Sequence, residues 1–219
     1  MKPFLVLSLC LLVLSVAGCK SMLGINKVQG SGTAKTEKRD VARFTAIEVQ
    51  CHGVVNVTAQ APASLSISGD DNIVPLITTE VRNGTLYIKS DKDYDTKSQL
   101  KIDVTTPDIE KFAFTGAGEV ALSKLRNEHV EISLSGAGRL TASGEAKEAD
   151  IALTGAGDLD AKDLHTVKTS VKSTGAGSVD VYATDELVAS ATGVGNVNYY
   201  GNPKQVKTQA TGLGSIDRK

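Results

Sequence analysis

Apolar and polar residues alternate along most of the chain, at the period expected for β-strands rather than helices. The clearest alternations place two apolar residues two positions apart, in runs that each lead to a glycine triplet. These pairs are Phe112 and Phe114, Ile132 and Leu134, and Ile151 and Leu153. The pattern predicts short strands that enter a glycine corner and leave it as another strand.

The glycine triplets recur six times at a nearly constant period of about 19 residues. Their glycines are Gly116 and Gly118, Gly136 and Gly138, Gly155 and Gly157, Gly175 and Gly177, Gly193 and Gly195, and Gly212 and Gly214. The residue before each triplet carries a hydroxyl group: Thr115, Ser135, Thr154, Thr174, Thr192 and Thr211. An aliphatic residue stands four positions after each first glycine: Val120, Leu140, Leu159, Val179, Val197 and Ile216.

A constant period favours a solenoid over a sandwich, because stacked coils must place like residues over like, about 4.8 Å apart. We therefore predict an all-β fold, a right-handed single-stranded parallel β-helix with coils of about 19 residues. The predicted domain covers residues 39–219, with regular coils over residues 110–219. The glycines are expected to leave room for the neighbouring coil, and the hydroxyl residues to form a ladder beside the corner.

The first half of this domain repeats the strand-to-glycine pattern less regularly and is predicted to form degenerate coils. The run Leu65-Ser66-Ile67-Ser68-Gly69 is one example. The pair Asn83-Gly84 between two apolar runs is a strong turn signal and predicts a tight hairpin or corner.

The N-terminus is typical of a secreted, lipid-anchored protein. Lys2 precedes an apolar run that is too short to span a bilayer, and small residues lead to Cys19, as in the lipobox of bacterial lipoproteins. We predict a signal peptide over residues 1–18, lipidation of Cys19, and a flexible tether over residues 19–38. An Asp directly after the lipidated cysteine would resemble an inner-membrane retention signal, but this position holds Lys20. We therefore predict a cell envelope protein at the outer membrane, on its periplasmic or surface face.

Cysteine content and charge narrow the classes of function. Cys51 is the one cysteine left in the predicted domain and lies in an apolar alternation, so we expect a small buried side chain and no disulfide. The formal charge of −1 gives no reason to expect a nucleic-acid partner. The 21 glycines and 9 aromatic residues indicate a core of small and β-branched side chains.

Several motifs resemble one known family. Phe44-Thr45-Ala46-Ile47-Glu48-Val49, Gly53-Val54-Val55-Asn56-Val57, Gly69-Asp70-Asp71-Asn72-Ile73, Asn83-Gly84-Thr85-Leu86 and the repeated Ser/Thr-Gly-Ala-Gly are similar to the putative auto-transporter adhesin, head GIN domain family. The resemblance covers about residues 28–219. It implies a right-handed β-helix in an envelope protein, commonly lipid-anchored, without an established catalytic activity. The sequence departs from the repeated pattern at Ser173, Val194 and Leu213.

A carbohydrate-active enzyme of the lyase or hydrolase type is the alternative function, because parallel β-helices host such sites. The best candidates for its carboxylates are Asp158, Asp160 and Asp163, with Arg139 one coil away. The alternating charges of this column are more typical of a solvated surface. His52, His129 and His165 lie at different phases of the period, so we expect no metal site and no cofactor.

The leading hypothesis is a non-catalytic, lipid-anchored envelope protein that adheres to or interacts with protein or glycan. A purely structural spacer is the third hypothesis, after the carbohydrate-active enzyme. The sequence stops soon after the sixth glycine corner, which predicts an open strand edge there. We expect that edge to be covered by a second copy or by another envelope protein.

Overall fold

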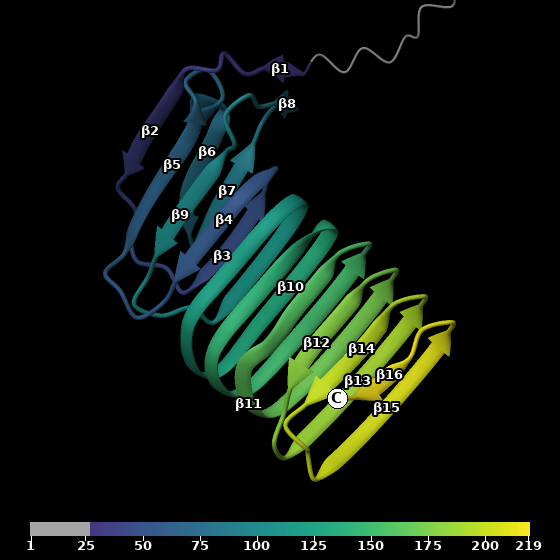
Figure 1. Cartoon of the computed structure of the whole chain (residues 1–219). Coiled ribbons are helices and arrows are strands. Elements are labelled where there is room, and N and C mark those ends of the chain that lie inside the picture. The colour runs from purple at the N-terminus through teal and green to yellow at the C-terminus, as the bar shows by residue number, and fades with distance from the viewer. Residues whose placement is uncertain (1–26) are drawn as a thin grey trace, which may run out of the picture.

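The computed structural model describes residues 27–219, and its secondary structure is almost entirely β-strand (Figure 1). The all-β prediction is therefore confirmed. Strands of the N-terminal part are β1 (Val28–Gln29), β2 (Ala34–Arg39), β3 (Ala46–Gln50), β4 (Gly53–Thr58), β5 (Ser64–Asp70), β6 (Ile77–Arg82), β7 (Thr85–Ser90), β8 (Tyr94–Asp95) and β9 (Lys101–Thr105), with a 3₁₀ turn, η1, at Val74–Leu76. Over these described residues, no helix is long and apolar enough to cross a membrane.

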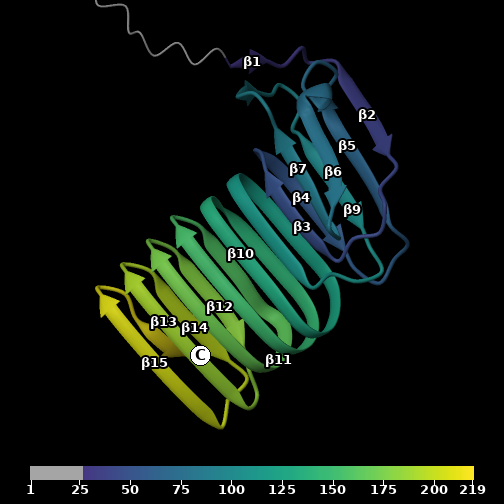
Figure 2. The ribbon, with the colours of Figure 1, turned by 180° about the vertical axis from the view of Figure 1, so that it is seen from behind.

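The C-terminal part is a ribbon that runs through successive, similar turns, visible from both sides (Figures 1 and 2). Its strands are β10 (Lys111–Gly155), β11 (Asp158–Gly175), β12 (Ser178–Tyr182), β13 (Glu186–Gly193), β14 (Asn196–Tyr200), β15 (Gln205–Gly212) and β16 (Ile216–Arg218). We call the segment from one glycine triplet to the next a repeat. Each repeat contributes one strand that leaves a glycine corner and one that enters the next.

Neighbouring repeats pair in parallel and in register. Gly155 pairs with Gly175, Gly175 with Gly193, and Gly193 with Gly212, along the ladders β10–β11, β11–β13 and β13–β15. On the leaving side, β11 pairs with β12, β12 with β14, and β14 with β16. Equivalent residues of successive repeats therefore lie beside one another along a single direction.

Aliphatic side chains form a continuous column inside this stack. Leu140 pairs with Leu159, Leu159 with Val179, and Val179 with Val197. All four are at most 1% exposed. Removing each such side chain from water stabilises the fold by about 1.5–3 kcal/mol. Because no disulfide joins the described residues, this burial and the backbone ladders hold the structure together.

The differences in repeat length all fall on the side away from the glycine triplets. In the pairing of β10 with β11, Thr141 faces Asp160 but Ser143 faces Asp163, so the later repeat is longer at this point. The offset between neighbouring repeats does not change across the triplets themselves, as the pairs Gly193–Gly212 and Val197–Ile216 both show. We call the variable segments, residues 162–167, 182–185 and 201–204, the far corner.

The first half differs from the uniform parallel arrangement that the sequence predicted. Strands β3 and β4 pair in parallel with β10 and so begin the stack, but β5 pairs antiparallel with both β2 and β9. β6 and β7 also form an antiparallel hairpin, with Asn83 and Gly84 in its two-residue turn at φ values of 51° and 76°. The hairpin predicted at this pair is thus confirmed. The short turn at Asn83 and Gly84 returns β7 beside β6, whereas β5 meets its antiparallel partners β2 and β9 across intervening strands.

The segment predicted as a tether contains ordered strands. Residues 34–38 belong to β2, which pairs with β5, and Val28 and Gln29 pair with Tyr94 and Asp95. The alternation that would have indicated β2 is absent, because its residues Ala34-Lys35-Thr36-Glu37-Lys38-Arg39 are almost all polar and mostly exposed. The predicted signal peptide and Cys19 lie outside the described residues.

Candidate binding surfaces

The glycine corners stack directly on one another. A Cβ added at Gly136 would lie 2.3 Å from the carbonyl oxygen of Gly116, and one added at Gly212 would lie 2.2 Å from that of Gly193. Second glycines behave in the same way: a Cβ at Gly177 would lie 1.8 Å from the oxygen of Gly157. No side chain fits at these distances, so the backbone approach itself requires glycine.

The hydroxyl residues before the triplets form a row along this edge. Thr154 pairs with Thr174, Thr174 with Thr192, and Thr192 with Thr211, and all four are exposed. Thr115 and Ser135 continue the row on β10, where Thr115 pairs with Gln50. Within residues 27–219 no hydrogen bond joins one of these hydroxyl groups to the next, so the row is a set of solvated donors and acceptors.

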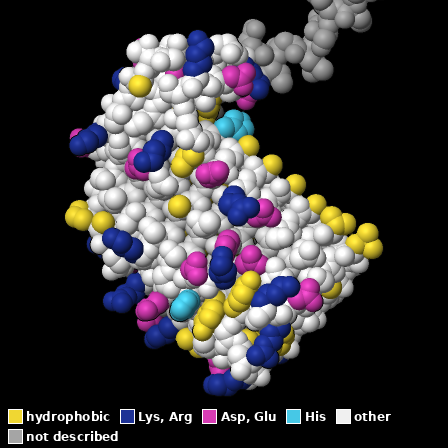
Figure 3. All heavy atoms as spheres, in the orientation of Figure 1, with side chains coloured by type: hydrophobic (Ala, Val, Ile, Leu, Met, Phe, Trp, Pro, Cys, Tyr) yellow, Lys and Arg dark blue, Asp and Glu magenta, His cyan; other side chains and the backbone are white. Residues whose placement is uncertain are grey.

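A row of exposed apolar residues runs beside these hydroxyl groups, at the middle of each triplet (Figure 3). Its members are Ala117, Ala137, Ala156, Ala176, Val194 and Leu213. The side chains grow toward the last repeats, where Val194 is 55% and Leu213 is 89% exposed. The row is a narrow apolar edge rather than a pocket.

The carboxylates of the alternative enzymatic hypothesis do not converge, and two of the three are paired separately with basic side chains. Asp158 Oδ2 lies 3.3 Å from Arg139 Nη2, on an exposed part of the surface. Asp160 forms an ion pair with Lys162, and this hydrogen bond raises the pKa of the Lys162 ammonium group. Asp163 is exposed. Among the described residues no group of three or more His, Cys, Asp and Glu side chains is arranged to hold a metal ion.

Cys51 is a buried free thiol, as the sequence predicted. Burial raises its pKa to about 12, although a hydrogen bond with Tyr94 opposes that shift. The Tyr94 hydroxyl accepts a hydrogen bond from the backbone N–H of His52 at 2.9 Å and donates one to its carbonyl oxygen at 2.6 Å. Both its burial and the raised pKa favour the neutral thiol, which packs as a small apolar side chain.

Asp70 is a buried charged residue whose structural role the sequence did not reveal, although it lies in the motif Gly69-Asp70-Asp71-Asn72-Ile73. Its carboxylate is buried and accepts hydrogen bonds from the backbone N–H groups of Gly32 at 2.9 Å, Lys97 at 2.8 Å and Ser98 at 3.2 Å. Burial by itself raises the pKa of Asp70, but these N–H groups more than offset it, so the pKa is lowered. The carboxylate fastens residues 30–33 to the loop before β9.

Asn72 reinforces this attachment. Its side chain accepts a hydrogen bond from the N–H of Ser31 at 2.9 Å and donates one to the carbonyl oxygen of Gln29 at 2.8 Å. The Asp70 and Asn72 side chains of this motif therefore hold the N-terminal arm, residues 27–33, because they take the place of backbone hydrogen-bond partners.

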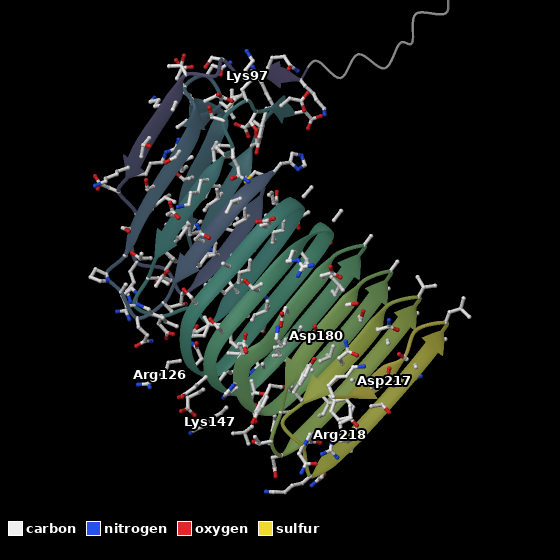
Figure 4. All side chains as sticks on the ribbon, in the orientation of Figure 1. Lys97, Arg126, Lys147, Asp180, Asp217 and Arg218 are labelled. Atoms are coloured by element: carbon white, nitrogen blue, oxygen red, sulfur yellow. The ribbon has the colours of Figure 1, made fainter. Side chains whose placement is uncertain are left out.

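A groove of about 1160 Å³ lies on the far-corner side of the molecule, and its lining residues fall between the glycine triplets in the sequence. Five segments from successive turns of the chain contribute most of its lining, from within residues 108–111, 126–131, 145–147, 165–167 and 182–184, and Ala46 lines it beside its register partner Lys111. We call it the lateral groove. Figure 4 shows Arg126 and Lys147 projecting from this edge of β10, while Asp180 and Asp217 lie elsewhere on the surface.

Ion pairs between neighbouring turns border the lateral groove. Lys147 Nζ lies 2.7 Å from Glu128 Oε2, and Lys111 Nζ lies 2.6 Å from Glu131 Oε2. The hydrogen bond from Lys111 lowers the pKa of the Glu131 carboxyl group. Because these side chains are largely exposed, each pair stabilises the fold by at most about 1 kcal/mol and remains free to exchange partners.

An aromatic pair closes one end of the groove. The rings of His165 and Tyr182 stack with their centroids 4.5 Å apart and an interplanar angle of 16°. The carbonyl oxygen of Tyr182 accepts hydrogen bonds from the buried hydroxyl groups of Thr166 and Thr169, the latter at 2.8 Å. Sequence reasoning missed this pair, because the two residues lie at unequal phases of the period.

The three histidines do not converge. His52 packs edge-on against Tyr94, His129 lies 3.5 Å from Asp150, and His165 stacks on Tyr182.

At the C-terminal end, β15 is exposed along its whole length and, among the described strands, pairs only with β13. Association through this edge remains a prediction.

Comparison with known proteins places the chain among bacterial adhesin-like proteins. The model of the family described as "Putative auto-transporter adhesin, head GIN domain" matches residues 43–203. A crystal structure of a putative adhesin from Bacteroides fragilis is similar, with 25% identity and a TM-score of 0.72, over 88% of this chain and 100% of that one.

A second structure shows the same fold at lower similarity. It is a putative lipid binding protein from Parabacteroides distasonis, with 21% identity and a TM-score of 0.57, over 88% of this chain and 99% of that one. No curated protein matches the chain.

Proposed function

Because the chain belongs to the putative auto-transporter adhesin, head GIN domain family, we propose that it is a non-catalytic binding protein of the bacterial cell envelope. The observation that carries this proposal is the in-register stacking of equivalent residues, which repeats the exposed hydroxyl residues before the glycine triplets along the molecule. Such a surface offers many copies of one weak contact, and weak contacts in series bind extended partners tightly. Its partners are surface proteins or glycans.

The stacked repeats support a right-handed parallel β-helix over residues 110–219. Successive repeats pair in parallel at a nearly constant offset of about 19 residues, as one turn of a β-helix requires. The handedness follows from the preference of parallel crossover connections. The antiparallel strands β2, β5 and β6 cover the N-terminal end of this stack, so that its first ladder is not an open edge.

A lipid anchor at Cys19 fits the way in which the chain enters the domain. The N-terminal arm is fastened at Gly32 by Asp70, and Lys27 Nζ forms an ion pair with Asp95 at 3.2 Å. Lys27 follows Cys19 by eight positions. Since a fully extended chain spans at most about 3.6 Å per residue, the arm would lie within roughly 29 Å of the membrane. The domain would then stand close to the outer-membrane surface with a defined end toward it.

The non-catalytic assignment is supported by the family and by the separate pairing of Asp158 and Asp160 with basic side chains. A glycosidase needs two carboxylates that face one substrate bond, one of them held protonated. Asp160 has a carboxylate neighbour in its register partner Asp180, but Asp160 pairs with Lys162 and Asp180 accepts a hydrogen bond from the Asn198 amide at 2.6 Å, so both are already engaged by donors.

The proposal is tested by expressing the full chain in a diderm bacterium beside the variant Cys19→Ala. We expect radioactive palmitate to label the parent chain and the parent chain to fractionate with the outer membrane, whereas the variant does neither. Purified chain is then incubated with isolated envelopes and with host-cell surfaces that have been treated with protease or with periodate. Retention that one treatment abolishes supports binding to protein or to glycan, respectively, and no retention on any surface would contradict the proposed function.

A further inference from the structure

The lateral groove follows the stacking direction of the repeats. Its five lining segments come from successive turns, and neighbouring strands lie about 4.8 Å apart, so the groove extends over roughly 19 Å. It is open along its length rather than closed around a small molecule. A linear polymer whose units are similar in length to the strand spacing would meet one turn of the protein with each unit.

Backbone groups at the C-terminal end of the groove are paired. The N–H groups of Thr184 and Asp185 donate to the carbonyl oxygens of Thr166 and Val167 in the preceding turn, at 3.1 and 2.9 Å. These bonds run between turns, along the stack, and so do not point into the groove. An extended peptide cannot add a strand at these positions, because β-augmentation needs unpaired backbone groups.

The charges in the groove are mixed, with two more carboxylates than cations. Five carboxylate and three cationic side chains line it, and each cationic side chain lies within 4.0 Å of a carboxylate in a neighbouring turn. The remaining two carboxylates accept hydrogen bonds from neutral groups: Asp108 accepts from the amide group of Asn127 at 2.8 Å, and Glu110 accepts from the Thr45 hydroxyl at 3.2 Å. The groove therefore disfavours a polyanion, and a polycation would compete with the cations of its three ion pairs, whereas the hydroxyl groups of a neutral ligand can donate to the carboxylates and accept from the cations without breaking these pairs.

The end of the groove is rigid. Besides its stack with His165, the Tyr182 ring packs against Gly201, where a Cβ would lie 2.8 Å from Tyr182 Cζ. The buried hydroxyl groups of Thr166 and Thr169 fix the backbone of the same residue. A ring that is already immobile loses little entropy on binding, which makes it a suitable fixed contact for a flexible ligand.

We propose that the lateral groove binds an unbranched, neutral glycan that lies along the stack, with one end of the segment against Tyr182 and His165. This inference rests on the proposed binding function and names its ligand class and its site. The ligand is recognised by its hydroxyl groups, through the ion pairs Glu128–Lys147 and Arg126–Glu145.

The test titrates the full chain in detergent micelles with four probes: cellohexaose, the hexamer of N-acetylglucosamine, hexagalacturonate and oligolysine. Calorimetry is repeated with Tyr182→Ala, His165→Ala, and the double variant Glu128→Gln with Lys147→Gln. Tyr182→Phe keeps the ring, and Tyr87→Ala removes a tyrosine that lies on β7 beside Arg82, away from the groove. We expect a neutral hexasaccharide to bind, with a Kd that rises at least tenfold in Tyr182→Ala and in the double variant but less than twofold in Tyr87→Ala.

Three results would overturn the inference: neither neutral hexasaccharide binds, hexagalacturonate or oligolysine binds more tightly than both, or the groove variants bind like the parent chain. His165→Ala and Tyr182→Phe are expected to fold normally, and unchanged circular dichroism identifies a loss of binding that does not come from unfolding. If the hexasaccharides fail while the chain is still retained on envelopes or cells, the groove assignment is wrong and the proposed function stands. Loss of that retention contradicts the proposed function itself.

Discussion

A Cβ atom at Gly175 would lie 2.1 Å from the carbonyl oxygen of Gly155, its register partner in the preceding repeat. Gly175 also has a φ of 132°, a backbone conformation that residues with side chains rarely adopt. Both facts make this position depend on the absence of a side chain. The contact fixes how closely two neighbouring repeats approach.

Replacing that glycine should therefore destabilise the whole stack. Gly175→Ala is expected to lower the free energy of unfolding by about 1–3 kcal/mol from the backbone conformation alone, with the close contact adding to it. The adjacent variant Ala176→Val should change it by less than about 0.5 kcal/mol, because this position is exposed and Val194 occupies it in the next repeat. Urea denaturation followed by circular dichroism measures both. Equal losses in the two variants would show that the close approach has no energetic role.

Substitutions of inward and outward residues of β11 should lower the free energy of unfolding by different amounts in the same assay. Leu159 is 1% exposed, and Leu159→Ala is expected to cost about 2–5 kcal/mol because it leaves a cavity. Its neighbour Asp158 forms an exposed pair with Arg139, so Asp158→Ala should cost no more than about 1 kcal/mol. A large loss in Asp158→Ala would mean that the outward column, rather than the apolar column, supports the stack.

Alkaline pH should destabilise the protein through Cys51. The pKa of this thiol is about 12 in the folded state, against an ordinary value of 9.0, so the folded state keeps a proton that the unfolded state releases. The free energy of unfolding should consequently fall as the pH rises above about 9. Cys51→Ala should flatten this dependence, as followed by urea denaturation at several pH values. A chromogenic disulfide reagent at pH 8 should react only after unfolding, and rapid reaction in the native state would contradict the burial of the thiol.

Acid should act on Asp70 in the opposite sense. Its pKa is lower in the folded state than the ordinary 3.8, so the folded state binds this proton less readily, and the stabilisation is present above that value and lost as the pH falls below it. Asp70→Asn should loosen the N-terminal arm at neutral pH, because an amide cannot accept all the N–H groups that the carboxylate accepts. Hydrogen exchange over residues 27–39 measures the effect. Asp91→Asn, at an exposed position of the loop after β7, is the control, and equal exchange in both variants would contradict the role of Asp70.

The regular half of the fold could be predicted because each repeat carries its own signal. The glycines, the hydroxyl residues before them and the aliphatic residues after them recur at a period that only stacking explains, and the register of Leu140, Leu159 and Val179 follows directly from it. The buried state of Cys51 and the hairpin at Asn83 also followed from local patterns.

The remaining features depend on contacts between distant segments. β2 carries no apolar alternation, since it pairs at an edge, and its antiparallel partner β5 begins only at Ser64, after two intervening strands. The stack of His165 on Tyr182 arises because the far corner changes length between the two repeats, which moves residues of unequal phase into contact. A period measured at the glycine triplets carries no information about these changes.

The edge formed by the glycine triplets is constant between repeats, whereas the far corner varies in length, and this difference governs how such proteins diversify. An insertion or deletion at the far corner, such as the extra residue beside Lys162, is absorbed within a single turn and does not disturb the triplets. Residues 165–167, 182 and 184 of the far corner also line the lateral groove, so changes there reshape the groove one turn at a time while the stacked triplets stay the same. For the engineer, residues 162–167, 182–185 and 201–204 are therefore the places to graft new loops.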